Sequence, residues 1–292
     1  MAAKTVYTYL NIVGSVVRIA ADKDIFPENL RKLSMFLVAP QAYDLDLTIR
    51  AVDKLAEPEG ICEYRDGGRV DYRTDDGSIT YFGSVGETVD GAYIRIHKKG
   101  AVSHAQVKRS AFGDTITSRV ILEALDIEHL AIKNRCFLFH CSYIIYKGKA
   151  ILFTAPSGTG KSTQANLWHS LRNAEIINGD RAGVLVNNSG IFAIGLPFSG
   201  SSGICKNITS PIGSIVSLSQ APETSICKLN PVLAFQKIWE GCSVPRGSEE
   251  LTAFCCDTVM EVINSVPVFS LACTPDETAV AALESALKCE GL

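Results

Sequence analysis

The spacing of apolar and polar residues changes once along the chain. Up to about residue 114, short segments such as 44–50 alternate apolar and polar positions, and turns such as 75–77 separate them. Alternation with period two is typical of half-buried strands. We therefore expect a β-rich region over residues 1–114, with one helical stretch after Pro27. The expected strands are residues 6–10, 15–19, 44–50, 69–72, 79–82, 92–96 and 105–107.

From residue 115 the apolar residues recur at helical spacing, and Asp114 is placed to cap the helix that this spacing predicts through about Lys133. Strand-like and helix-like segments then alternate to the C-terminus, which is typical of an α/β domain. We therefore predict an α/β domain over residues 115–292. Its expected strands are 137–140, 142–146, 150–154, 174–177, 183–186, 190–194, 214–218 and 268–272, and its expected helices are 162–171, 231–240, 248–264 and 276–288.

A glycine-rich segment follows the apolar run 150–153. Its residues are Ala155, Pro156, Ser157, Gly158, Thr159, Gly160, Lys161, Ser162 and Thr163. This order fits a phosphate-binding loop (P-loop, Walker A), with Ala155 where the usual pattern has its first glycine. The alternative is a turn that merely joins a strand to a helix, which would leave Lys161 unfavourably at a helix N-terminus with no anion.

Each part of such a loop has a physical role. Gly158 and Gly160 permit a positive φ and close approach of the backbone to an anion. Backbone N–H groups and the positive end of the next helix bind phosphates. Lys161 is then expected to reach the β- and γ-phosphates of ATP, and Ser162 to bind Mg²⁺.

Three further residues are candidates for the same site. Asp180 ends the apolar strand after the loop helix, where it could hold Mg²⁺ and orient an acceptor hydroxyl; the alternative is a turn aspartate beside Gly179. Arg181 could neutralise phosphate charge or form a surface pair. His140 could orient a carboxylate or contact the γ-phosphate, or it could be a core histidine. The glycine- and serine-rich segment 197–203 could bind a second anion or the acceptor, or be a flexible hairpin loop.

Composition and missing motifs exclude several classes of protein. The chain has 292 residues with a net charge of −3 and no long basic run, which disfavours nucleic-acid binding. No stretch approaches a membrane span and no export signal is evident, so we expect a cytoplasmic protein. The 10 cysteines include no Cys-x-x-Cys, which favours reduced core cysteines over a zinc or disulfide framework. The sequence has no Asn-Lys-x-Asp motif, which disfavours a GTPase. It also has no obvious apolar run ending in Asp-Glu, which disfavours a motor or transporter ATPase.

Four segments together resemble the catalytic domain of HPr kinase/phosphorylase and, more distantly, the nucleotide-binding part of phosphoenolpyruvate carboxykinase. They are 139–142, 147–153, 156–163 and 178–181, and the resemblance covers about residues 136–220. In these families a histidine, the loop and an acidic pair form one site, in which the acidic pair serves Mg²⁺ and the acceptor hydroxyl. The resemblance implies that His140 takes the histidine position, Lys161 and Ser162 the loop positions, and Asp180 one position of the acidic pair.

The sequence departs from that family in two ways. The acidic pair is reduced to Gly179-Asp180-Arg181, so one carboxylate serves both purposes or a second comes from elsewhere. Residues 1–114 show no counterpart of the domain that precedes the catalytic domain of true HPr kinases. The chain therefore looks closer to diverged stand-alone kinases that phosphorylate serine on precursor peptides or small molecules.

The sequence thus predicts an ATP- and Mg²⁺-dependent phosphotransferase. Its expected partner is a hydroxyl-bearing peptide, protein or small molecule, and a homo-oligomer is compatible with the sequence. In this prediction Asp180, His140, Lys161 and Arg181 are catalytic, and Ser162 and Asp180 hold the metal. The alternatives are a nucleotide-binding sensor without phosphotransfer and a carboxykinase-like enzyme.

Overall fold

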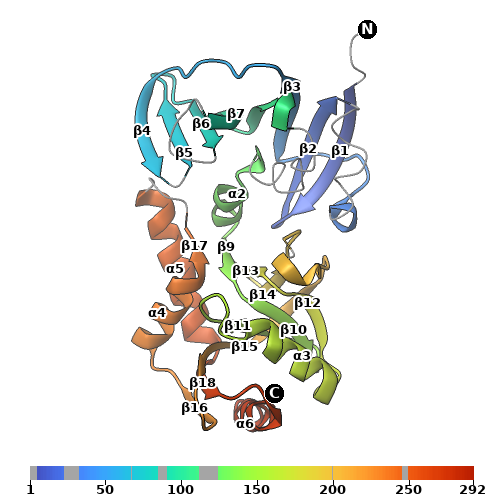
Figure 1. The fold of residues 1–292 in the computed structure, drawn as a ribbon, viewed down its shortest axis with the longest axis vertical. Helices are drawn as coiled ribbons and strands as arrows, with labels where there is room; N and C mark the ends of the chain where they lie inside the picture. Colours follow the sequence, from blue (N-terminus) through green and yellow to red (C-terminus); the bar gives the residue numbers. More distant parts are fainter. Residues whose placement is uncertain are drawn as a thin grey trace. The chain divides into compact units, whose positions relative to one another are not determined.

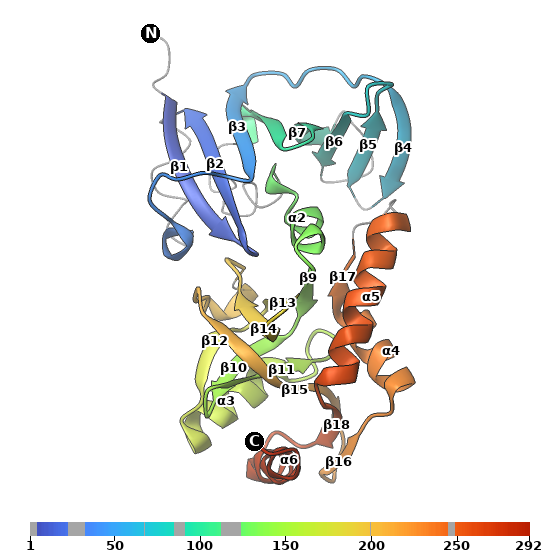
Figure 2. The same ribbon diagram turned by 180° about the vertical axis from the view of Figure 1, so that it is seen from behind.

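The computed structural model describes residues 5–22, 33–66, 68–84, 91–111, 124–198, 200–244 and 249–292. The chain divides into two compact units, Met1–Leu130 and Ala131–Leu292 (Figures 1 and 2). The boundary predicted between residues 114 and 115 lies outside the described ranges, as do the cap predicted at Asp114 and the start of the helical stretch after Pro27.

The first unit contains an eight-stranded sheet in the order β1-β2-β3-β8-β7-β6-β5-β4. β2 pairs parallel with β3 and β3 with β8, whereas the other neighbours are antiparallel. In β3 the alternating residues Leu45, Leu47 and Ile49 are buried, as period two requires. The strands are β1 (Thr5–Ile12), β2 (Ser15–Asp22), β3 (Leu45–Val52), β4 (Ile61–Asp66), β5 (Arg69–Arg73), β6 (Ile79–Ser84), β7 (Ala92–Lys99) and β8 (Val102–Lys108).

The second unit is of mixed α/β class, as the alternation of elements predicts. Its sheet has the order β12-β10-β11-β15-β14-β13-β9-β17, and β18 pairs with both β15 and β16. The strands are β9 (Cys136–His140), β10 (Ser142–Tyr146), β11 (Lys149–Thr154), β12 (Glu175–Asn178), β13 (Arg181–Asn187), β14 (Gly190–Gly195), β15 (Thr209–Gln220), β16 (Ser225–Lys228), β17 (Cys242–Ser243) and β18 (Val268–Cys273).

The α-helices of the described residues are α2 (Ile127–Lys133), α3 (Lys161–Arg172), α4 (Pro231–Gly241), α5 (Glu249–Ser265) and α6 (Glu277–Cys289). Helices cover both faces of the second unit's sheet, α3 and α6 on one and α4 and α5 on the other. In the described part of the chain, no helix has both the length and the apolar character needed to cross a membrane.

β11 lies in the middle of these layers. Ala150 and Leu152 pack in the core on the α4 and α5 side, whereas Ile151 and Phe153 pack against α3 and α6. Burial on both faces explains why the 150–153 run is continuously apolar. β11 pairs parallel with β15, and β15 with β18, so the carboxyl ends of these three strands lie at one edge of the sheet.

The sequence pattern missed β4, β16 and β17 and shortened β15. β15 begins at Thr209, whereas the predicted strand began at 214. The prediction started late because Pro211 and Gly213 normally weaken a strand. Here the first part of β15 pairs with β14 and the rest with β11, so one strand joins both halves of the sheet. The spacing of apolar residues in the sequence does not reveal that β15 pairs with both strands.

The cysteines are free thiols, and five of them are buried. Burial raises the pKa of the Cys136 and Cys141 thiols well above their ordinary value. These two buried thiols are therefore protonated and pack as small apolar groups.

The packing of α3 on the sheet predicts a large effect of replacing Trp168. This side chain is fully buried and its ring lies 5.0 Å from that of Tyr146 in an edge-on contact. We expect Trp168→Ala to lower the free energy of unfolding by about 3–5 kcal/mol, measured by urea denaturation. Leu171→Ala, on the more exposed side of the same helix, should change it by about 0.5 kcal/mol or less. Equal effects of the two substitutions would contradict this packing.

Candidate active site

The 155–163 loop connects the carboxyl end of β11 to the first turn of α3. Gly158 has φ of 80° and Gly160 has φ of 118°, a region that other residues rarely adopt. A Cβ atom added to either glycine would meet nothing within 4 Å, so the space beside the loop is open. The two glycines are thus required by backbone conformation, and the open space leaves room for a ligand.

The N-terminus of α3 has no side-chain cap among the described residues. Gly160 is its N-cap, whereas Asn230 and Asp276 accept backbone hydrogen bonds at the starts of α4 and α6. The first N–H groups of a helix lack partners within the helix, and the helix dipole favours an anion beside them. Ser162 and Thr163 are exposed on this first turn, so their hydroxyl groups are accessible.

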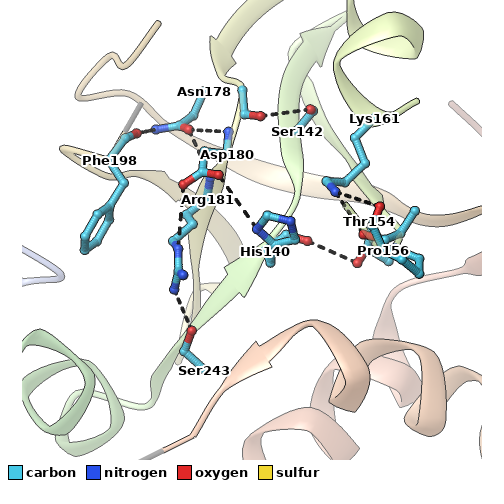
Figure 3. A network of polar contacts seen from close by, with 12 residues as sticks. His140, Ser142, Thr154, Pro156, Lys161, Asn178, Asp180, Arg181, Phe198 and Ser243 are labelled. Carbon is cyan, nitrogen blue, oxygen red and sulfur yellow. Dashed lines mark hydrogen bonds and ion pairs between the residues drawn. The ribbon is translucent and has the colours of Figure 1, made fainter. Parts of the chain in front are cut away.

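Lys161 is held against its own loop, as Figure 3 shows. The side chain is only 8% exposed, and its ammonium donates hydrogen bonds to the carbonyl oxygens of Ala155 (2.9 Å) and Pro156 (3.3 Å). An ammonium has three donors, so these two bonds leave one for another acceptor. Burial lowers the pKa of Lys161, while the nearby Cys141 and Asp180 raise it.

Asn178 at the end of β12 fixes the turn that presents Asp180. Its Oδ1 accepts hydrogen bonds from the backbone N–H groups of Asp180 (2.8 Å) and Arg181 (3.0 Å). Its Nδ2 donates to the carbonyl oxygens of Leu196 (2.9 Å) and Phe198 (2.6 Å). Asn178 is completely buried, and its role was not predicted, although Asn followed by Gly-Asp is a turn signal.

The carboxylate of Asp180 lies between two nitrogen-bearing side chains. Its Oδ1 is 3.8 Å from His140 Nδ1, and its Oδ2 is 3.7 Å from Arg181 Nε. His140 and Arg181 are cross-strand partners in β9 and β13, so the sheet register brings them together. Arg181 Nη1 also donates to Ser243 Oγ at 2.7 Å. Both distances to Asp180 exceed hydrogen-bond length, so its oxygens can still accept hydrogen bonds.

His140 interacts electrostatically both with Asp180 and Arg181 and with Lys161 of the loop. Partial burial is the main cause that lowers its pKa, the positive charge of Lys161 lowers it further, and Asp180 opposes both effects. The imidazole is therefore neutral at pH 7. Thr154 Oγ1, at the end of β11, donates to the His140 carbonyl oxygen at 3.1 Å and links the two strand ends.

The site carries two cations, Lys161 and Arg181, and one carboxylate, Asp180. These groups leave a net positive charge suited to an anion.

The 197–203 segment packs beside Asp180. Gly200 lies so close that a Cβ atom there would be 2.9 Å from the Asp180 Cβ, and residues Gly200–Ser202 form a short 3₁₀ turn. Ser199 lies outside the described residues. This close packing restrains Asp180, and the second anion site considered for this segment stays a prediction.

A pocket of about 580 Å³ lies at the other side of the loop. It is lined by Gly158, Thr159, Gly160, Thr163 and Gln164 from the loop and α3, by residues 218–222 at the carboxyl end of β15, and by residues 273–275 at the carboxyl end of β18. The sequence did not indicate that these last two segments lie beside the loop, because each is ordinary in composition and only the sheet order places it there.

Comparison with known proteins gives little support for an assignment. No protein-family model and no curated protein matches the sequence. Among solved structures, the HPr(Ser) kinase/phosphatase from Coxiella burnetii matches 53% of this chain and 93% of its own, with 12% sequence identity and a TM-score of 0.30. This likeness is weak, and the family resemblance stays a prediction.

The electrostatics of the site predict how His140 titrates. We expect its pKa, measured by NMR of the imidazole protons, to lie below the ordinary 6.5. Lys161→Met should raise this pKa and Asp180→Asn should lower it further, because the substitutions remove charges of opposite sign. Since the folded pKa is depressed, His140 should destabilise the fold increasingly as the pH falls from 6.5 toward the folded pKa. A His140 pKa that changes with neither substitution would contradict this arrangement.

Proposed function

We propose that this protein is an ATP-dependent phosphotransferase that moves the γ-phosphoryl group to a hydroxyl group. The acceptor would be a serine of a peptide or protein, or a small-molecule alcohol. The observation that carries this proposal is the juxtaposition of an uncapped helix N-terminus and a buried lysine with the Asp180 carboxylate. Phosphoryl transfer needs mainly positioning and charge stabilisation, which these groups can supply.

Each side chain would have a distinct task. The loop N–H groups and Lys161 would bind the phosphates and stabilise the charge that develops during transfer. Asp180 would accept a hydrogen bond from the acceptor hydroxyl and orient it toward the γ-phosphorus. Neutral His140, 3.8 Å from Asp180, would help to keep the carboxylate in place, and Arg181 would balance its charge.

The residues present fit the Mg²⁺ that such a reaction uses. Ser162 offers an exposed hydroxyl, and the Asp180 oxygens are not taken up by hydrogen bonds shorter than 3.5 Å to His140 or Arg181. Protein Mg²⁺ sites often use one or two carboxylates together with phosphate oxygens and water. When bound there, the ion would neutralise charge on the phosphates.

A nucleotide sensor without turnover is the second candidate. One observation favours it: among the described residues, Asp180 is the one carboxylate that acts electrostatically on Lys161. A kinase site commonly uses more than one acidic group, so a single carboxylate could be enough for binding and too little for catalysis. A carboxykinase-like activity has no such observation in its favour.

Replacing Lys161 tests the proposed role of the loop. We expect Lys161→Ala to reduce phosphotransfer from labelled ATP by several orders of magnitude, because it removes a cation at the transferred group. Lys149→Ala is the matched control, since that lysine is exposed at the start of β11. Circular dichroism should show that both variants remain folded. Full phosphotransfer by Lys161→Ala would disprove the mechanism.

Replacing Asp180 separates the two candidate functions. In a kinase, Asp180→Asn should retain ATP binding by calorimetry and lose at least about a hundredfold in turnover, because an orienting and proton-accepting group is lost. If the protein is a sensor, the wild type itself should bind ATP but form no labelled product when it is mixed with labelled ATP, Mg²⁺ and cell extract. Binding by the wild type without labelled product would replace the proposed function with the sensor.

A further inference from the structure

The pocket of about 580 Å³ beside the loop is not used by any step proposed above. Its size lies within the range of small-molecule sites, roughly 300–1,000 Å³. Leu218, Ala221, Pro222 and Pro275 give it apolar walls, and Thr163 and Gln164 from α3 add polar groups. A pocket of this kind next to an anion site fits the uncharged part of a phosphorylated ligand.

The sheet order gives the direction in which such a ligand would lie. β11 has β10 and then β12 on one side, and β15 and then β18 on the other. Asp180 follows β12, whereas the pocket is lined by the carboxyl ends of β15 and β18 and the residues that follow them. A triphosphate whose terminal group points toward Asp180 would therefore extend its other end past Gly160 and Thr163 into the pocket.

Gln164 supplies an independent sign that the pocket binds a polar ligand. Its side chain is 2% exposed and lines the pocket, and its Nε2 donates to Cys273 Sγ at 3.4 Å. Its Oε1 is buried and has no hydrogen-bond partner among the described residues. A buried acceptor without a donor is unfavourable, so a ligand that donates a hydrogen bond here would remove an existing penalty.

We propose that this pocket binds the nucleoside part of the nucleotide and that Gln164 is a specificity residue for its base. The Oε1 atom would accept a hydrogen bond from the exocyclic amino group of adenine, and the apolar walls would hold the faces of the ring. This proposal rests on the proposed nucleotide binding. It adds that the pocket selects a base with an amino group over one with a carbonyl oxygen at the same position.

Three ligands separate the contributions of phosphate, nucleoside and base. Calorimetry would measure the dissociation constants of ATP, of ITP, which has a carbonyl oxygen in place of the adenine amino group, and of inorganic tripolyphosphate. The wild type should bind ATP about five- to tenfold more tightly than ITP, as one hydrogen bond allows, and tripolyphosphate more weakly than either. These ratios need no variant, so they test the proposal even if a substitution impairs folding.

Gln164→Leu is the substitution that tests the residue directly. It should weaken ATP binding to the level of ITP and leave tripolyphosphate binding unchanged, because the phosphate groups do not depend on the amide. Gln236→Leu on the exposed side of α4 is the matched control and should change none of the three constants.

The outcomes distinguish this inference from the function on which it rests. Equal affinity for all three ligands would overturn the nucleoside pocket and leave the phosphate site standing. A preference for ATP that survives in Gln164→Leu would overturn the role of Gln164. Binding of none of the three would overturn the proposed function and this inference together.

Discussion

The site depends on a buried ammonium group that is solvated by its own backbone. Lys161 is almost fully buried and donates to two carbonyl oxygens of the loop, and no carboxylate of the described residues forms a hydrogen bond with it. Taking a cation out of water without a paired charge is unfavourable. Such an arrangement is reasonable where an anion is to complete the shell of the cation, and the open space beside Gly158 and Gly160 is where that anion would lie.

The sheet explains why the loop and its partners meet. β11 is buried on both faces, so its last residue and the loop that follows are held between helix layers. Asn178 then fixes the turn at the end of β12, and the β9 and β13 register places His140 opposite Arg181. The positions of these side chains therefore follow from backbone positions that the core determines.

The local elements of the site were accessible from sequence because their signals are contiguous. An apolar run, a glycine-rich segment and helical spacing follow one another, and the structure has β11, the loop and α3 there. Asp180 was identifiable because it ends an apolar strand. The structure brings one of its carboxylate oxygens to 3.8 Å from His140 Nδ1.

What the sequence did not reveal depends on pairing between distant segments. Ser243 receives a hydrogen bond from Arg181 only because β17 joins β9 at the edge of the sheet. Nothing in the sequence distinguishes Gln164 from other polar residues of the predicted helix. In the structure it is buried beside Cys273 at the end of β18. No periodicity or propensity encodes either contact, because both depend on the order of strands in the sheet.

The most direct test of the account is to observe the loop amides while a nucleotide is added. In two-dimensional ¹H–¹⁵N NMR spectra, titration with ATP and Mg²⁺ should move the amide signals of Gly158, Gly160 and Lys161 to a saturating end point. The amide of Gly148, in the turn before β11, should stay in place. If the loop signals do not move at ATP concentrations that saturate any binding elsewhere on the protein, the loop is not an anion site and the account is wrong.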